Sequence, residues 1–242
     1  MDKSLPGSNP GLLYVNSAIK DQRLSEEAYT EWYEKRHIPD VFSTTGPGAP
    51  TQAYRWKALD AAAEKAYLAL YPTTEVAFLG SDEFKQIPVH CDKLPGSGKT
   101  SIFELADFDT RYYKLKQLYA REFEHVGKPQ PDFVVVAAFT PADEEDYEQW
   151  YQQEHLQEIA KITCWRKTER YELFFARSNR DYDKPLLAQK PKFLTLHFFD
   201  GQALPEQELA KASESEWTKK SMASMKKAEV AAFQKLAYFE KS

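Results

Sequence analysis

Residues 29–37 read YTEWYEKRH, and residues 147–155 read YEQWYQQEH. Both segments follow the pattern Tyr-x-x-Trp-Tyr-x-x-x-His, with one copy in each half of a chain of 242 residues. The shared positions fall at i, i+3, i+4 and i+8, which lie on one face of an α-helix. The duplication therefore predicts two equivalent helices, each with an aromatic face and a histidine near its end.

The segments around each copy predict the same order of elements. Hydrophobic periodicity and turn residues predict strand, helix, strand, strand, helix and strand over residues 12–19, 25–37, 53–59, 66–71, 73–87 and 111–123. The same order is predicted over residues 133–140, 143–162, 164–176, 193–199, 205–225 and 230–239. Pro39 should end or bend the first of these helices. Each half is thus expected to form a ferredoxin-like βαββαβ unit.

The two predicted units meet at a polar, proline-containing stretch. Lys128-Pro129-Gln130-Pro131 is typical of a linker, so we expect a first repeat over residues 1–127 and a second over 128–242. A single βαββαβ sheet carries helices on one face only, and its other face must be covered. Two such sheets packed together within one molecule would meet this need.

Composition excludes several classes of function. A net charge of −5 gives no basic footprint for nucleic acid, and the two cysteines are too few for a disulfide framework. No apolar run approaches the length of a membrane span, and the first residues do not form a signal peptide. The histidines are scattered without metal-ligand spacing. We therefore expect a cytoplasmic monomer or homodimer with no metal and no membrane or nucleic-acid partner.

The repeated helix motif resembles that of a known family. The EthD-like group of the dimeric α/β-barrel superfamily has an aromatic residue followed by a histidine near a helix end, as in Trp32-Tyr33-x-x-x-His37-Ile38-Pro39 and Trp150-Tyr151-x-x-x-His155-Leu156. The resemblance implies an α+β fold in which two ferredoxin-like repeats form an intramolecular dimeric α/β barrel. It also implies a cleft in each half for small aromatic or polyketide-like molecules. The second copy departs from the motif by lacking the proline.

We expect the chemistry in the first half, with His37, Tyr71 and Tyr14 as catalytic residues. A histidine changes its charge near neutral pH and can move a proton, while a tyrosine hydroxyl orients a substrate oxygen. Tyr14 and Asn16 share one face of the first strand, and their expected equivalents in the second half are the apolar residues Val135 and Ala137.

Further residues of the two aromatic faces and their facing strands are expected to bind substrate: Trp32, Tyr33, Asn16, Tyr151, His155 and His197. His197 takes the place of Tyr71 when the strand FLTLHFF is aligned with YLALY. Each histidine could instead hold a helix end or satisfy the core, and helix aromatics are more often core than pocket lining.

The leading functional prediction is a cofactor-independent enzyme for a small aromatic or polyketide-derived substrate. Cyclisation, decarboxylation, dehydration and isomerisation all fit histidine and tyrosine acid/base chemistry. One alternative is a non-catalytic small-molecule-binding or stress-related protein. The other, implied by the resemblance, is a haem-binding fused barrel with His155 or His197 as axial ligand. Nucleotide binding at Gly96-Ser97-Gly98-Lys99-Thr100 is rejected, because the required earlier glycine is Lys93.

Overall fold

The computed structural model describes residues 9–96, 99–120, 130–181 and 185–241. The first half contains β1 (Gly11–Ile19), α1 (Glu26–Trp32), the π-helical turn η1 (Tyr33–His37), α2 (Ile38–Ser43), β2 (Gln52–Ala58), β3 (Tyr67–Thr73), the 3₁₀ turn η2 (Val76–Gly80), α3 (Asp82–Lys85), α4 (Ile102–Leu105) and β4 (Ala106–Ala120). The second half contains β5 (Phe133–Thr140), α5 (Glu144–Trp150), the π-helical turn η3 (Tyr151–His155), α6 (Leu156–Ala160), β6 (Trp165–Ser178), η4 (Leu186–Gln189), β7 (Phe193–Phe199), α7 (Glu206–Lys211), α8 (Glu216–Ala223) and β8 (Lys227–Glu240).

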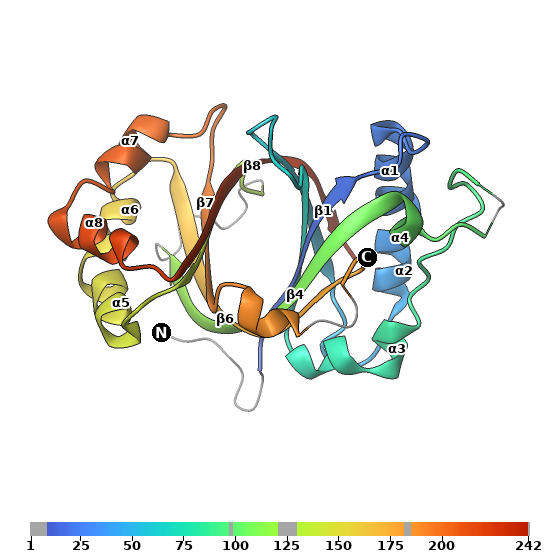
Figure 1. Cartoon of the computed structure of the whole chain (residues 1–242), viewed down its shortest axis with the longest axis horizontal. Coiled ribbons are helices and arrows are strands. Elements are labelled where there is room, and N and C mark those ends of the chain that lie inside the picture. Colours follow the sequence, from blue (N-terminus) through green and yellow to red (C-terminus); the bar gives the residue numbers. More distant parts are fainter. Residues whose placement is uncertain (1–8, 97–98, 121–129, 182–184, 242) are drawn as a thin grey trace.

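The strands form one closed antiparallel barrel. Their order is β1-β3-β2-β8-β5-β7-β6-β4, so each half contributes four neighbouring strands in the ferredoxin-like order. The halves join through the β2–β8 and β4–β6 pairs. In Figure 1 helices α1–α4 cover one end of the molecule and α5–α8 the other, with the strands between them. The predicted fold, an α+β fused dimeric α/β barrel, is confirmed.

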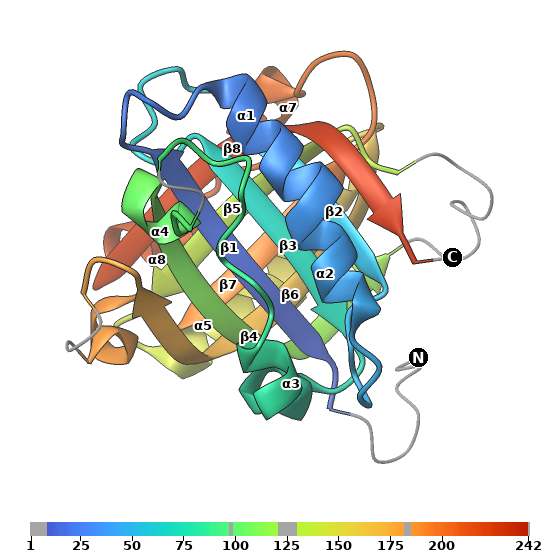
Figure 2. The same cartoon turned by 90° about the vertical axis from the view of Figure 1, so that its right-hand side faces the viewer.

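Strand alternation separates the barrel interior from the helix-covered faces. Inward-facing residues pack into one apolar cluster that draws on both halves: Leu12, Tyr14, Tyr54, Trp56, Leu68, Leu70, Tyr113, Val134, Val136, Ala138, Tyr171, Leu173, Leu194, Leu196, Phe198 and Phe233. The outward faces of the strands pack against the helices, as Figure 2 shows for α1 and α2, which lie in front of the sheet formed by β1, β3 and β2. The barrel interior is therefore packed core, which leaves the space between helices and sheet as a place for a site.

The two motif copies fold identically. Ser25 caps α1 and Asp143 caps α5 by accepting backbone N–H groups, and acidic residues follow in each first turn. In both copies the α-helix passes into a π-helical turn that ends at the histidine. The helix continues beyond Pro39 to Ser43, so the expected end near His37 is wrong. Pro39 is the second residue of α2 and directly follows the π-helical turn, where the regular α-helical hydrogen-bond pattern is already interrupted.

Other element boundaries differ from expectation where a serine starts a new helix. The segment 73–87 forms η2 and α3, with Ser81 capping α3, and the segment 205–225 forms α7 and α8, with Ser215 capping α8. The short helix α4 was not predicted. Residues 121–129 lie outside the described part of the chain, and with them the end of the strand expected over 111–123, the first two residues of the expected linker and the expected boundary between the repeats.

Strand register aligns the two halves residue by residue. Leu13 of β1 pairs with Tyr71 of β3, and Val135 of β5 pairs with His197 of β7. The alignment of Tyr71 with His197 makes Leu13 the equivalent of Val135. The expected equivalents of Tyr14 and Asn16 were therefore wrong by one position, and a shift of one residue exchanges the two faces of a strand. Their register equivalents are Val136 and Ala138, which face the barrel interior.

Among the described residues, no helix is long and apolar enough to cross a membrane.

We predict that Trp150→Ala lowers the free energy of unfolding by about 3 to 5 kcal/mol. The indole is 1% exposed and donates a hydrogen bond from Nε1 to Oγ1 of Thr218 on α8 over 2.9 Å. Chemical denaturation measures the loss. Val230→Ala, at a side chain that is 59% exposed, serves as control and should change stability by less than about 0.5 kcal/mol. A loss below about 1 kcal/mol for Trp150→Ala would contradict this packing role.

Candidate functional site

A buried arginine packs on the motif tyrosine in each half. The guanidinium of Arg55, on β2, lies 4.2 Å from the ring centre of Tyr33, and that of Arg170, on β6, lies 4.1 Å from the ring centre of Tyr151. Arg170 also forms an ion pair of 2.8 Å with Glu148 and lowers the pKa of that carboxyl to about 2. These contacts fix the helix against the sheet, and so fix where each histidine lies.

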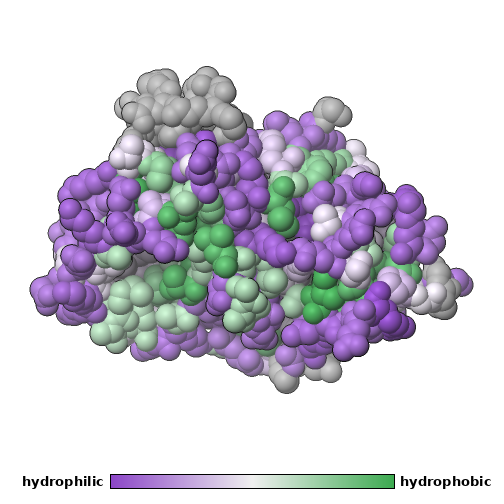
Figure 3. Space-filling model, turned by 90° about the horizontal axis from the view of Figure 1, so that it is seen from above, coloured by the Kyte–Doolittle hydropathy of each residue, from purple (hydrophilic) through white to green (hydrophobic). Residues whose placement is uncertain are grey.

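A cavity of about 700 Å³ opens in the second half, between β5, β7 and β8 on one side and α5–α8 on the other. Its walls are mainly apolar and include Val135, Trp150, His155, Ile159 and His197. Leu59, Met222 and Val230 line it as well and are exposed, so apolar side chains reach the surface there. From above, Figure 3 shows apolar side chains gathered into separate patches within a largely polar surface.

Smaller side chains help to open this cavity. Three strand positions facing the helix are smaller in the second half than at the equivalent positions of the first: Val135 against Leu13, Ala137 against Val15 and His197 against Tyr71. Protein interiors otherwise pack to high density, so each lost group leaves room unless another segment fills it.

In the first half, the chain between β3 and β4 fills the equivalent space. Leu94, Ile102 and Leu105 are buried against the motif helix, and Val89 packs beside them. The carbonyl of Pro88 lies beside the ring of His37 and partly offsets the lowering of its pKa by burial. In the second half, the corresponding connection forms α7 and α8, which stand as the outer wall of the cavity.

His155 lies at the inner end of the cavity. It is 8% exposed, its ring centre lies 4.5 Å from that of Trp150, and its Nδ1 has no hydrogen-bond partner. Burial, with the nearby charge of Arg170, lowers the pKa of His155 to about 4. The imidazole is therefore neutral at neutral pH.

His197 faces His155 across the cavity floor, with the ring centres 5.6 Å apart. Its Nδ1 lies 2.9 Å from Oγ1 of Thr168, and that oxygen accepts a hydrogen bond of 3.0 Å from Nε1 of Trp165. Burial, followed by the charges of His155 and Arg170, holds the pKa of His197 well below its usual value. Two neutral imidazoles thus share one apolar cavity.

The residues predicted to be catalytic are placed differently from expectation. The cavity in the second half is not lined by His37, Tyr71 or Tyr14. Tyr71 is buried in the first-half core, and His37 is partly buried at the end of the π-helical turn η1, where desolvation lowers its pKa to about 4. Tyr14 faces the barrel interior, on the opposite side of β1, so the expectation that it shares a space with His37 is wrong. Asn16 points the same way and donates a hydrogen bond to the Tyr14 hydroxyl.

The residues predicted to bind substrate divide between core and cavity. His155 and His197 line the second cavity, whereas Tyr151 lies behind them on Arg170. Trp32 and Tyr33 pack in the first-half core. Sequence reasoning missed Thr168 and Trp165. The available signal was that Thr168 stands three positions after Trp165 on a buried strand. This spacing does not reveal that Thr168 contacts His197 on β7.

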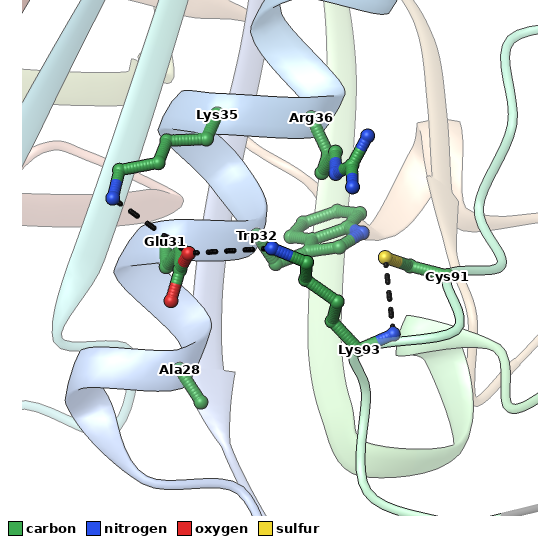
Figure 4. A pocket seen from close by; sticks show the side chains of 7 residues that line it. All are labelled: Ala28, Glu31, Trp32, Lys35, Arg36, Cys91 and Lys93. Atoms are coloured by element: carbon green, nitrogen blue, oxygen red, sulfur yellow. Dashed lines mark hydrogen bonds and ion pairs between the residues drawn. The ribbon is translucent and has the colours of Figure 1, made fainter. Parts of the chain in front are cut away.

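A second, smaller hollow of about 160 Å³ lies on the surface of α1 and η1. Figure 4 shows Lys35, Arg36 and Lys93 around the edge of Trp32, with Cys91 on the facing loop. Both lysines form ion pairs with Glu31, at 3.6 and 3.8 Å. The hollow is thus partly neutralised, and it is much smaller than the second-half cavity.

The residues of the larger cavity do not fit a haem group. Its lining includes Asp60 and Glu206 and, within the described part of the chain, no lysine or arginine. Haem carboxylates would meet acidic side chains there without a cation to balance them. Among the described residues there is also no cluster of three or more metal-binding side chains.

Comparisons with known proteins agree with the fold. No protein-family model matches the chain. Core atranone cluster (CAC) protein 1 of Stachybotrys chlorohalonatus (strain IBT 40285) is 25% identical over 201 residues, which cover 80% of this chain and 83% of that protein. A crystal structure of an anthrone oxidase-like protein superimposes with a TM-score of 0.56 at 13% identity, covering 96% of this chain and 94% of that one. At such identity the structural likeness establishes the fold alone.

We predict that stability falls as the pH falls from about 6.5 to about 4, partly through the buried histidines. His155 has a folded pKa of about 4, below its unfolded value, so the unfolded state binds the proton first. Each such histidine contributes up to about 1.4 kcal/mol per pH unit in this window. His155→Gln should therefore lose less stability than the unmodified protein between about pH 7 and pH 5, as measured by urea unfolding. Identical pH slopes for the two proteins would contradict the assignment.

Proposed function

We propose that the chain is a cofactor-independent enzyme that acts on a small aromatic or polyketide-derived molecule in the second-half cavity. The observation that carries this proposal is the pair of neutral imidazoles, His155 and His197, facing each other within an apolar cavity of about 700 Å³. A largely apolar pocket with a few convergent polar groups is the usual form of a small-molecule site.

The lining supports a flat, uncharged substrate. Trp150 and Phe139 offer aromatic surface, while Val135, Ala137 and Ile159 offer aliphatic surface. The acidic side chains that line the cavity disfavour a carboxylate ligand by charge repulsion. The volume accommodates several fused rings.

The histidines support acid-type chemistry at a substrate oxygen. A neutral imidazole with a lowered pKa donates its N–H to an oxygen that gains negative charge in the transition state. Such a bond is stronger in a cavity that excludes water. Isomerisation, cyclisation, dehydration and decarboxylation of ketonic substrates all develop charge on such an oxygen, so each remains within the proposal.

We also propose membership of the EthD-like group as a fused tandem repeat, with the repeats divided near residue 128. The motif at both helices, each ending in a π-helical turn at its histidine, supports this placement. Similarity to a protein of the core atranone cluster supports a role in processing a small molecule.

Binding without catalysis is the second candidate. The low pKa of His155 favours it, because an imidazole that resists protonation is a weak general base. A binding protein would retain its ligand unchanged.

A panel of phenolic and polycyclic aromatic ketones, analysed by mass spectrometry after incubation with the protein, tests the proposal. A product of unchanged mass marks isomerisation or cyclisation, whereas loss of water or carbon dioxide marks dehydration or decarboxylation. Tight binding without any product would favour the non-catalytic alternative. Neither binding nor product across the panel would contradict both.

On any substrate so found, we predict that His155→Gln lowers kcat by about 10² to 10⁴. His37→Gln should leave kcat within about threefold, since a packed loop separates His37 from substrate. Circular dichroism confirms folding of both variants. Greater damage from the His37 variant would place the chemistry in the first half instead.

A further inference from the structure

A chain of hydrogen bonds ends at the ring of His197. Nε1 of Trp165 is a donor only, so Oγ1 of Thr168 accepts its proton. The hydroxyl of Thr168 then has its own proton to donate, and Nδ1 of His197 lies 2.9 Å away. All three side chains are buried, at 3% exposure or less. No other acceptor for this proton occurs among the side-chain contacts of the described residues.

This order of donors determines the tautomer of His197. If Nδ1 accepts the Thr168 proton, a neutral ring carries its own proton on Nε2. Because Nδ1 points toward Thr168 and the ring lines the cavity, Nε2 is the nitrogen that faces the cavity. His197 therefore presents an N–H group to a ligand.

His155 presents the same group for a different reason. Its Nδ1 is buried and has no partner. A buried N–H without an acceptor is rarer and costlier than a buried lone pair without a donor, so the bare nitrogen is Nδ1 and Nε2 carries the proton. The two rings lie 5.6 Å apart in an edge-to-face arrangement.

The first half contains an equivalent of the missing ligand. Nδ1 of His37 is also buried without a partner, so Nε2 is the ring nitrogen that can donate to the nearby Pro88 carbonyl. The same helix position thus faces a carbonyl oxygen in one half of the molecule. In the second half no chain segment of the described residues supplies that carbonyl to His155.

We infer that the ligand of the second-half cavity carries a ketone-type carbonyl oxygen that accepts hydrogen bonds from Nε2 of both His155 and His197, and that Thr168 and Trp165 are positioning residues that set the His197 tautomer. This inference rests on the proposed function of the same cavity. A carbonyl oxygen has two lone pairs and no proton, which matches two donors. With both Nε2 atoms protonated, neither ring offers the cavity an acceptor for the proton of a hydroxyl group.

The tautomer is tested without any ligand. Long-range ¹H–¹⁵N correlation spectra of protein labelled in histidine should show His197 protonated at Nε2. Thr168→Val removes the donor at nearly equal volume, and the Nδ1–H form should then appear. Thr110→Val, at a buried strand threonine of the first half, is the matched control and should leave His197 unchanged. A His197 protonated at Nδ1 in the unmodified protein would overturn the positioning role.

The carbonyl requirement is tested with a matched pair of probes, 9-fluorenone and fluorene, which differ by one oxygen at the same ring system. Isothermal titration should give fluorenone an affinity about tenfold higher, although fluorene is the more apolar molecule. The carbonyl stretch of bound fluorenone should move to lower frequency. Both effects should diminish in Thr168→Val and persist in Thr110→Val.

The possible outcomes separate this inference from the proposed function. Equal affinities for the two probes, or a preference unchanged by Thr168→Val, would overturn the inference while leaving the cavity as a small-molecule site. Failure of both probes to bind would count against the inference and the proposed function together. The expected preference, with its loss in the Thr168 variant alone, would establish the carbonyl site.

Discussion

A guanidinium buried on a tyrosine ring holds each of the two motif helices to its sheet. Arg55 and Arg170 are almost fully buried, and a buried charge is costly unless it is compensated. Tyr33 and Tyr151 supply aromatic faces at 4.2 and 4.1 Å, and Glu34 and Glu148 supply the opposite charge. Because these partners lie on the motif helices, helix and strand must stay in register. The position of each histidine follows from this constraint.

The same constraint allows the two halves to differ elsewhere. With the motif helix held in place, the space between helix and sheet next to the histidine can be filled by another segment of the chain or left open. The first half fills it with the connection between β3 and β4, whose Pro88 carbonyl meets His37. The second half has the smaller residues Val135, Ala137 and His197 on its strands. Its connection between β7 and β8 forms α7 and α8, which line the outer side of the cavity. One half is thus packed, and the other half contains a cavity.

The fold could be predicted from the sequence because a duplicated helix pattern and strand order are local properties. The cavity could not be predicted in the same way. It is open only where the connection before the last strand leaves the space between helix and sheet unfilled, and that connection is distant in sequence from the helix motif. Counting polar residues such as Tyr14 favoured the first half, because strand register was misplaced by one residue, whereas the larger cavity lies in the second half. His155 and His197 were found through the repeat itself. Thr168 and Trp165 were missed, as their role requires pairing between β6 and β7.

If the second half binds the ligand, only its two cavity histidines should sense binding. Histidine ring signals of isotope-labelled protein, followed during titration with 9-fluorenone, measure this. His155 and His197 should shift together as the ligand binds, while His37 stays unchanged. A shift of the His37 ring with silent His155 and His197 would contradict binding in the second half.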